Sequence, residues 1–395
     1  MLHVAISTSV NQRGKSGVAT YLFGLIDGLL RGCPEVRLTL FGLAGDRPLF
    51  ARWLDRAAWQ EVAEFWRPAG RDILWHQLVL PRRLREIGAE VVHIPSYRRI
   101  LARPPCPQVI TVHDCAAFQV QGKYDRARMA YGRHMVPRLA RRANHLITVS
   151  HATARDVETF FHRPAGEIAV IWNGIDHARF RPPAAAELDA FRARQQLVRP
   201  YVVYLARLEH PAKNHLRLIE AFERLVTARP DWPHELVLAG ADWHGAAVIH
   251  SRVAISPARA RIRTPGFVEP TDLALWYAGA DALVYPSLFE GFGLPPVEAM
   301  ACGCPVVCSE RGALGEVVAD AAHLIDPLDP DSIAAGLRAV LAEPSAWRQR
   351  GLARARIFDW DACAAATAAI YHQAAQPSPY SLEKSPPQEG PFRGA

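Results

Sequence analysis

Short apolar runs alternate with helix-period segments along the whole chain, and this alternation constrains the fold more than any other feature. The runs that predict strands are 2–6, 36–41, 90–94, 109–112, 146–149 and 168–171, followed by 201–205, 235–239, 282–285, 305–308 and 323–325. An amphipathic helix is predicted over 18–29, and Ser150 is placed to cap a helix over 151–161. Repeated strand–helix units build parallel sheets covered by helices. The sequence therefore predicts an α/β protein.

The pattern breaks once, in a stretch of proline and alanine near 181–186. A chain of 395 residues fits two domains of about 150 residues or more. The predicted divisions are a first domain over 1–180, a linker over 181–198, a second domain over 199–358, a helix within 359–376 and a polar, Pro-rich disordered tail over 377–395. Two doubly wound domains would meet at a cleft formed by the carboxyl ends of their strands, where such sheets bind ligands.

Composition excludes several classes of protein. Half of the residues are hydrophobic and 22% are charged, as in soluble globular proteins. No apolar run has the length of a membrane span, and the start lacks the features of a secretory signal. The seven cysteines are an odd number scattered over a long chain, which predicts reduced thiols in a cytoplasmic protein.

Basic residues give the chain a net charge of +7, yet only four of the 46 are lysines. Six arginines and one aspartate fall between Tyr124 and Arg142. As a helix, this segment could rest on anionic lipid at the inner face of the membrane. The alternative is a solvated outer helix. No nucleic-acid motif accompanies the charge, so no nucleic-acid partner is expected.

The residues after the predicted strand 282–285 carry two glutamates. We expect Glu290 in the loop at the strand's end and Glu298 in the first turn of a helix, because Pro295-Pro296 suits a helix start. Both carboxylates would face the cleft and suit the vicinal hydroxyls of a sugar or ribose, while backbone N–H groups between them suit oxyanions. The alternative is that Glu298 only complements the helix dipole and Glu290 is solvated.

Two cations follow the first strand of the second domain. Arg207 and Lys213 bracket a short loop, and Asn214 is placed to cap the next helix. Fixed cations beside a helix N-terminus can hold a pyrophosphate. The alternative is a solvated loop.

Two residues of the first domain also follow strands. Gly17 opens a helix and allows the backbone to approach a phosphate, although a plain turn glycine is the alternative. His113 lies on the same predicted rim, where it could donate a hydrogen bond, act as an acid or base, or be structural.

Two metal-like patterns have simpler explanations. Asp329-Pro-Asp331 precedes a helix that the first aspartate can cap. Cys302, Cys304 and Cys308 lack the second matched pair of a zinc site and suit buried small residues. We therefore predict no metal site.

Taken together, the motifs resemble a known family. Glu290 and Glu298 enclose seven residues that include Gly-Phe-Gly-Leu-Pro, and Arg207 and Lys213-Asn214 precede them. With Gly266-Phe-Val before a helix, this pattern is similar to that of the retaining glycosyltransferases of family 4 (glycosyl transferases group 1). The resemblance is strongest over 200–345. It implies the GT-B fold, in which two Rossmann-like domains face an interdomain cleft and a last helix, here 360–375, crosses back to the first domain.

The resemblance also assigns roles. It implies catalytic roles for Arg207, Lys213, Glu290 and His113. It implies donor binding by Gly17, Phe292, Gly293, Leu294 and Glu298. The two cations would hold the donor's pyrophosphate, Glu290 the hydroxyls of the transferred sugar, and Glu298 the ribose.

The implied activity is retaining, metal-independent hexosyl transfer without a cofactor. The donor would be a GDP- or UDP-linked sugar, with mannose slightly preferred, and the acceptor a hydroxyl of a glycan or lipid-linked glycan in bacterial polysaccharide or glycoconjugate biosynthesis. Two alternatives stay open: a sugar-nucleotide epimerase of the same fold, which isomerises its substrate without an acceptor, and a non-catalytic nucleotide-sugar-binding protein.

Overall fold

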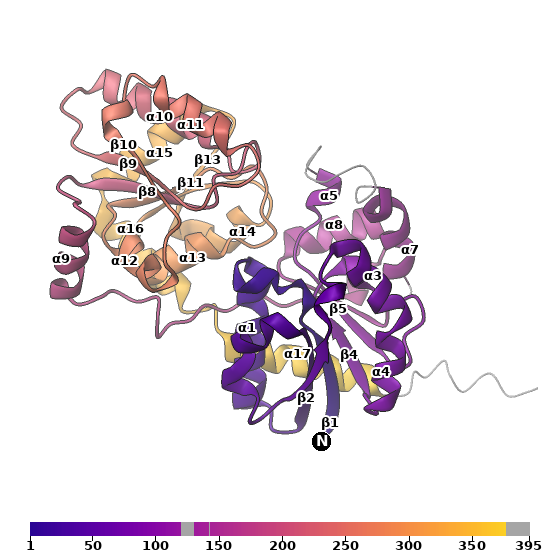
Figure 1. The fold of residues 1–395 in the computed structure, drawn as a ribbon. Helices are drawn as coiled ribbons and strands as arrows, with labels where there is room; N and C mark the ends of the chain where they lie inside the picture. The colour runs from indigo at the N-terminus through magenta and orange to yellow at the C-terminus, as the bar shows by residue number, and fades with distance from the viewer. Residues whose placement is uncertain (120–129, 142, 377–395) are drawn as a thin grey trace, which may run out of the picture.

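A computed structural model describes residues 1–119, 130–141 and 143–376, and it shows two lobes, each built on a parallel sheet (Figure 1). The strands of the first sheet are β1 (Leu2–Ser7), β2 (Val36–Leu43), β3 (Ala58–Val62), β4 (Val91–Ile94), β5 (Gln108–Val112), β6 (His145–Thr148) and β7 (Ile168–Val170). Those of the second are β8 (Tyr201–Leu205), β9 (Glu235–Ala239), β10 (Ile262–Gly266), β11 (Ala282–Tyr285), β12 (Val306–Ser309) and β13 (His323–Ile325).

Both sheets have the strand order of a doubly wound domain. The first runs β3-β2-β1-β4-β5-β6-β7 and the second β10-β9-β8-β11-β12-β13. In each, the order reverses beside the first strand of the domain, and ligands of open α/β sheets bind outside such a switch point. The predicted α/β class with two Rossmann-like domains is confirmed.

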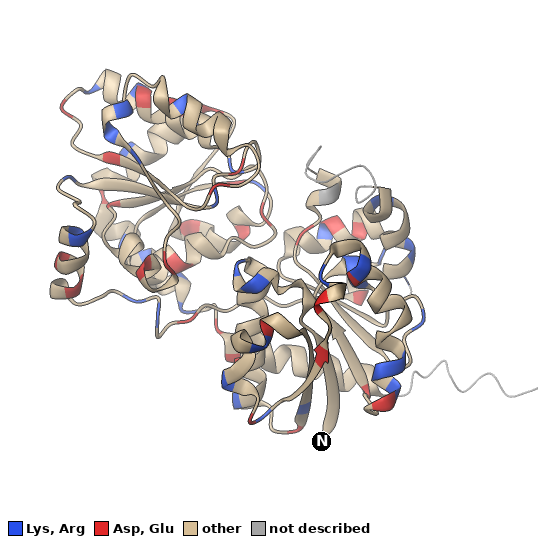
Figure 2. Ribbon diagram, in the orientation of Figure 1, with Lys and Arg blue, Asp and Glu red and all other residues tan. Residues whose placement is uncertain are grey.

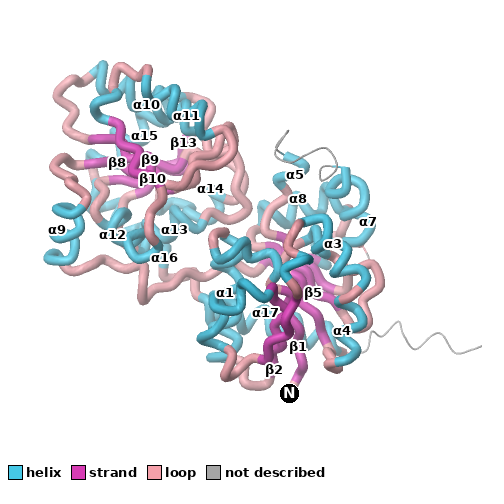
Figure 3. Tube along the Cα trace, viewed as in Figure 1, coloured by secondary structure: helices cyan, strands magenta, loops and turns pink. Residues whose placement is uncertain are grey.

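Helices surround the central strands of each lobe (Figure 3). In the first lobe they are α1 (Gly17–Gly32), α2 (Arg47–Phe50), α3 (Ala69–Leu78), α4 (Leu80–Glu86), α5 (Ala116–Gln119), α7 (Val136–Ala140) and α8 (His151–Phe161). In the second lobe and beyond it they are α9 (Ala185–Arg194), α10 (His215–Ala228), α11 (Ala246–Ala254), α12 (Leu273–Ala278), α13 (Leu294–Ala301), α14 (Leu314–Val318), α15 (Pro330–Ala342), α16 (Pro344–Ala355) and α17 (Trp360–Ala375). Ser150 caps α8 as predicted, since its side chain accepts a hydrogen bond from the Thr153 N–H.

Two of the strands were not predicted from the sequence, and both lie at sheet edges. Among the described strands, β3 pairs only with β2, and β10 only with β9. Most side chains of both strands are partly or fully exposed, so neither strand needs a continuous apolar run. Trp59-Gln60-Glu61 in β3 and Arg263-Thr264-Pro265 in β10 accordingly lack the signal that marks the central strands.

The segment predicted as a linker, 181–198, contains a helix. Phe191 on α9 is fully buried and packs edge-on against Trp276, with ring centroids 5.2 Å apart. Arg192 on the same helix donates to the Gly279 carbonyl. This part of the segment is therefore packed on the second lobe.

The last helix returns to the first lobe (Figure 1). Trp360 and Tyr371 of α17 belong to the same apolar cluster as α1 and β1, and the Tyr371 hydroxyl lies 2.6 Å from His93 Nδ1. Glycine makes the approach of α1 possible: a Cβ on Gly24 would lie 2.1 Å from the Trp360 indole.

All seven cysteines lie in the described residues and all are free. Among the described helices, none combines the length and apolar character needed to cross a bilayer.

The contact between α1 and α17 gives a prediction of stability. Gly24→Ala should lower the free energy of unfolding by about 1–3 kcal/mol, because the added methyl overlaps the Trp360 ring. Thermal and denaturant unfolding will measure this loss. Gly32→Ala on the same helix is the control, since the added Cβ would meet no described atom within 4 Å. An equal loss in that variant would contradict the assignment.

Candidate active site

A lysine and a glutamate meet at the carboxyl ends of two neighbouring central strands of the second sheet. Lys213 follows β8, and Glu290 follows β11, its partner strand. Lys213 Nζ lies 2.5 Å from Glu290 Oε1, and only 16% and 18% of the two side chains is exposed. The two charges that the sequence placed on separate loops thus form one largely buried ion pair.

Two hydroxyls donate to the same oxygen of Glu290. The Tyr285 hydroxyl lies 3.0 Å from Oε1, and Ser287 Oγ lies 2.7 Å from it. Burial raises the pKa of Tyr285 well above its usual range, and the charge of Glu290 adds to this, so the hydroxyl keeps its proton. Three donors on one oxygen fix the orientation of the carboxylate.

Arg207 also follows the carboxyl end of β8, and its side chain is more exposed than that of Lys213. Its guanidinium stacks over the Trp243 indole, 4.6 Å from the ring centroid, and lies 3.7 Å from the Glu209 carboxylate. The side chain is 41% exposed. Stacking fixes the plane of a guanidinium while its N–H groups can still donate to an anion.

Asn214 does not cap α10 as predicted. Its backbone is left-handed, with φ at 59°, and its side chain accepts no bond from the helix N-terminus. Instead the side-chain amide donates to the carbonyls of Pro286 and Pro327. Asn214 therefore ties the loop of Lys213 to the loop that leads to Glu290.

Glu298 lies at the start of the second turn of its helix and not, as predicted, in the first turn. The two prolines do occupy the first turn of α13, but this helix begins at Leu294, so Glu298 falls in the second turn. Its carboxylate accepts a bond of 3.1 Å from the Tyr277 hydroxyl. Burial raises the pKa of Glu298 to about 7. Dipole complementation in the first turn thus does not account for this residue.

The backbone before α13 is shaped by glycine. Gly293 has φ at 95°, a conformation that favours glycine, while Phe292 is buried in the second core. Leu294 is the first residue of the helix. The three positions predicted to bring backbone groups to a donor therefore form the turn into α13.

His113 follows β5 and reaches the boundary between the lobes. Burial lowers its pKa to about 4, so the ring is neutral at pH 7. Nε2 is buried without a hydrogen-bond partner among the described residues. The neutral ring can exchange a hydrogen bond with a ligand hydroxyl, but it does not act as a cationic acid at neutral pH.

The loop before α1 also faces the second lobe. A Cβ on Gly17 would meet no atom of the described residues within 4 Å, so close packing among them does not explain the glycine. Lys15 Nζ lies 5.7 Å from the ring centroid of Phe267, which follows β10. The predicted phosphate loop therefore opens toward the second lobe.

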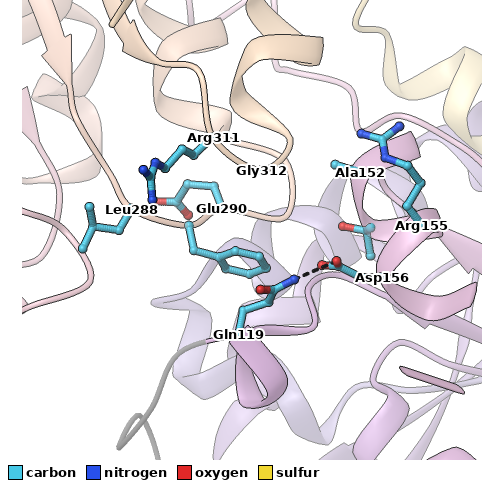
Figure 4. A pocket seen from close by; sticks show the side chains of 10 residues that line it. Gln119, Ala152, Arg155, Asp156, Leu288, Glu290, Arg311 and Gly312 are labelled. Carbon is cyan, nitrogen blue, oxygen red and sulfur yellow. Dashed lines mark hydrogen bonds between the residues drawn. The ribbon is translucent and has the colours of Figure 1, made fainter. Parts of the chain in front are cut away.

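A pocket of about 330 Å³ lies between the lobes (Figure 4). Glu290 and Arg311 line it from the second lobe, and Gln119, Arg155 and Asp156 from the first. Gln119 Nε2 donates to Asp156 Oδ1 over 2.9 Å. The pocket thus joins the fixed carboxylate of Glu290 to polar side chains of the other lobe.

The remaining sequence patterns lie elsewhere. Asp329 caps α15 by accepting from the Asp331 N–H, and Cys302, Cys304 and Cys308 are buried as expected. In the described part of the chain, no group of three or more His, Cys, Asp or Glu side chains is arranged to hold a metal ion.

Basic side chains are spread over both lobes (Figure 2). Of the arginine-rich segment 124–142, residues 124–129 and 142 lie outside the described residues. The expected contact with lipid stays a prediction.

Sequence reasoning missed three residues that shape the site: Tyr285, Ser287 and Trp243. Tyr285 and Ser287 stand within five residues of Glu290, but their spacing does not show that they share one of its oxygens. Trp243 follows β9, a neighbour of β8, and only the sheet order brings it to Arg207.

The two lobes define a glycosyltransferase of the GT-B class. The sequence profile of "Glycosyltransferase Family 4" matches residues 15–179, and that of "Glycosyl transferases group 1" matches residues 188–355. The O-antigen chain mannosyltransferase B of Escherichia coli is 33% identical over 306 residues, which cover 75% of this chain and 78% of that protein. The chain belongs to the family 4 glycosyltransferases.

Two further proteins are similar. The MMP α-(1→4)-mannosyltransferase of Mycolicibacterium hassiacum is 34% identical over 247 residues, 61% of this chain and 56% of that protein. The structure of Anabaena HepE in complex with UDP and glucose has a TM-score of 0.74 at 18% identity and covers 94% of this chain and all of that one. The latter likeness shows the shared fold.

The Lys213–Glu290 pair predicts coupled effects on stability. Lys213→Met should lower the free energy of unfolding by about 3 kcal/mol, because it leaves Glu290 largely buried without its cation. Lys213→Met with Glu290→Gln should recover most of that loss. Thermal unfolding of the two variants, with the exposed Lys15→Met as control, tests this; a double variant no more stable than the single one would contradict it.

Glu298 predicts a pH dependence of stability. Its pKa is raised in the folded state, from about 4.5 to about 7, so the protonated form is favoured by folding. Its stabilising contribution is present below pH 4.5 and is lost as the pH rises through 7. The thermal midpoint of the wild type should therefore fall relative to that of Glu298→Gln between these values. A difference independent of pH would contradict the shift.

Proposed function

We propose that this enzyme transfers a hexose, with mannose preferred, from a nucleoside diphosphate sugar to a hydroxyl of a glycan or lipid-linked glycan, with retention of the anomeric configuration. The observation that carries the proposal is that Arg207, Lys213 and the fixed Glu290 carboxylate all lie at the carboxyl ends of the central strands β8 and β11. The two mannosyltransferases among the relatives support the choice of sugar.

The cations serve the leaving group. Breaking the bond between the sugar and phosphate places negative charge on the nucleoside diphosphate. Arg207 presents N–H donors beside Trp243, and Lys213 adds a largely buried charge. Backbone N–H groups at the turn over 292–294 and near Gly17 would contact the phosphates. These groups supply the stabilisation that a metal ion gives in other enzymes, so we propose that catalysis needs none.

Hydroxyls of the donor have three matching acceptors. Glu290 is oriented toward the transferred sugar by the three side chains that donate hydrogen bonds to it. His113 Nε2, buried and without a described partner, suits a further sugar hydroxyl. Glu298 suits the ribose hydroxyls, since a carboxylate accepts from two neighbouring O–H groups.

Retention follows most simply from attack on the same face. Glu290 Oε1 is already engaged by a cation and two hydroxyls, which makes it a poor nucleophile. In the proposed step the anomeric carbon loses its phosphate oxygen and gains the acceptor oxygen on that face. The acceptor's proton passes to the departing phosphate. The acceptor would enter through the pocket beside Glu290.

A screen of donors tests the proposal. Purified protein is incubated with GDP- and UDP-linked hexoses, with and without oligosaccharide acceptors, and in the presence of EDTA. We expect transfer to the acceptor, with GDP-mannose as the better donor and no loss in EDTA. An isomerised donor without acceptor would indicate an epimerase, and donor binding without turnover a binding protein; either result would overturn the proposal.

Arg207 gives the matching prediction for catalysis. Arg207→Ala should lower kcat by about 10²–10³-fold, as for the loss of an oxyanion donor, while Trp243→Leu should have a smaller effect through the lost stacking. Steady-state kinetics measures both. Arg229→Ala is the control, since Arg229 also packs over an indole, that of Trp232, but lies at the end of α10. A drop as large as that of Arg207→Ala would contradict the assignment.

A further inference from the structure

The N-terminus of α8 in the first lobe is a contact point for the second lobe. Glu316 of α14 reaches across the boundary, and its carboxylate accepts from the N–H groups of His151 and Ala152 over 2.7 and 2.9 Å. The Trp172 indole donates to the same carboxylate over 3.2 Å. The first N–H groups of a helix lack partners within the helix. Here the Glu316 carboxylate of the other lobe accepts hydrogen bonds from two of these N–H groups.

The loop of Glu290 is bound to the same helix end. Ser150 Oγ and Thr153 Oγ1 lie 2.8 and 3.2 Å from the Gly291 carbonyl oxygen. Both hydroxyls are buried. A carbonyl oxygen has two lone pairs, so it can accept from both hydroxyls at once.

Gly291 is a glycine because the lobes touch there. A Cβ on Gly291 would lie 1.7 Å from the His113 carbonyl oxygen. Its backbone does not have a positive φ, so the close approach of the first lobe, rather than its own conformation, excludes a side chain.

The second contact also returns to Glu290. The Ala313 N–H donates to the Glu290 carbonyl over 3.2 Å, and Ala313 directly precedes the helix that carries Glu316. The peptide groups on both sides of the Gly291 Cα are therefore held to α8, one directly and one through α14.

We propose that Ser150, Thr153 and Glu316 are positioning residues, which orient Glu290 for catalysis by docking the second lobe on the N-terminus of α8. This inference rests on the proposed function only for its kinetic consequence. The docking also sets how closely the lobes approach, because its contacts cross the boundary between them. If the lobes separate, the hydrogen bonds between the α8 N–H groups and the Glu316 carboxylate break.

Glu316→Ala and Gly291→Ala test the proposal by different routes. The first removes the carboxylate, and the second keeps every docking side chain but adds a methyl that prevents the approach. We expect both to lower kcat by about 10–100-fold, the range for a small misplacement of reacting groups. The Kd for the free nucleoside diphosphate should change less than kcat does, because Arg207 and Lys213 of the second lobe are untouched. Glu316→Gln, which keeps one oxygen acceptor, should recover part of kcat.

Glu158→Gln is the matched control, since it removes an exposed carboxylate from the same helix. Small-angle X-ray scattering of each full-length variant supplies a readout independent of activity: the radius of gyration should increase for Glu316→Ala and Gly291→Ala and not for Glu158→Gln. Wild-type kcat and wild-type scattering in the first two variants would overturn the proposal. If no donor is turned over by the wild type, the proposed function fails, while scattering still decides whether the docking exists.

Discussion

One oxygen atom, Glu290 Oε1, accepts hydrogen bonds from Lys213, Tyr285 and Ser287, and the organisation of the site depends on that convergence. The donors come from the ends of two neighbouring strands. A largely buried carboxylate is costly unless it is paired and hydrogen-bonded, so the position of the loop and the charge of its glutamate are fixed together. The result is an acceptor group that is in place before any ligand arrives.

The fold was predictable where burial requires a continuous run of apolar residues. Central strands such as β1 and β8 are covered on both faces, so they read as continuous apolar runs. The edge strands β3 and β10 lack a continuous apolar run and were not predicted. Ser150 was predictable as a cap because its effect is local, whereas Asn214 was not, since its partners Pro286 and Pro327 come from distant loops.

The same distinction applies to the site. Glu290, Lys213 and Arg207 stood out by residue type and by their place after strands. The sequence did not show that Lys213 and Glu290 form a pair, because pairing depends on β8 lying beside β11. It also placed Glu298 in the first turn of α13 instead of the second, since the prolines mark the start of this helix only approximately. Nothing in the sequence indicates that Gly291 packs against the backbone carbonyl of His113 in the other lobe.

The return of α17 to the first lobe has a practical consequence for dissecting the enzyme. An isolated fragment that ends near residue 180 would lack α17, and the apolar side chains of α1 that this helix covers would face water. A fragment that begins near residue 181 would instead carry α17 with nothing to cover. Separate expression of the halves should therefore begin from a circularly permuted or fused chain that keeps α1 and α17 together.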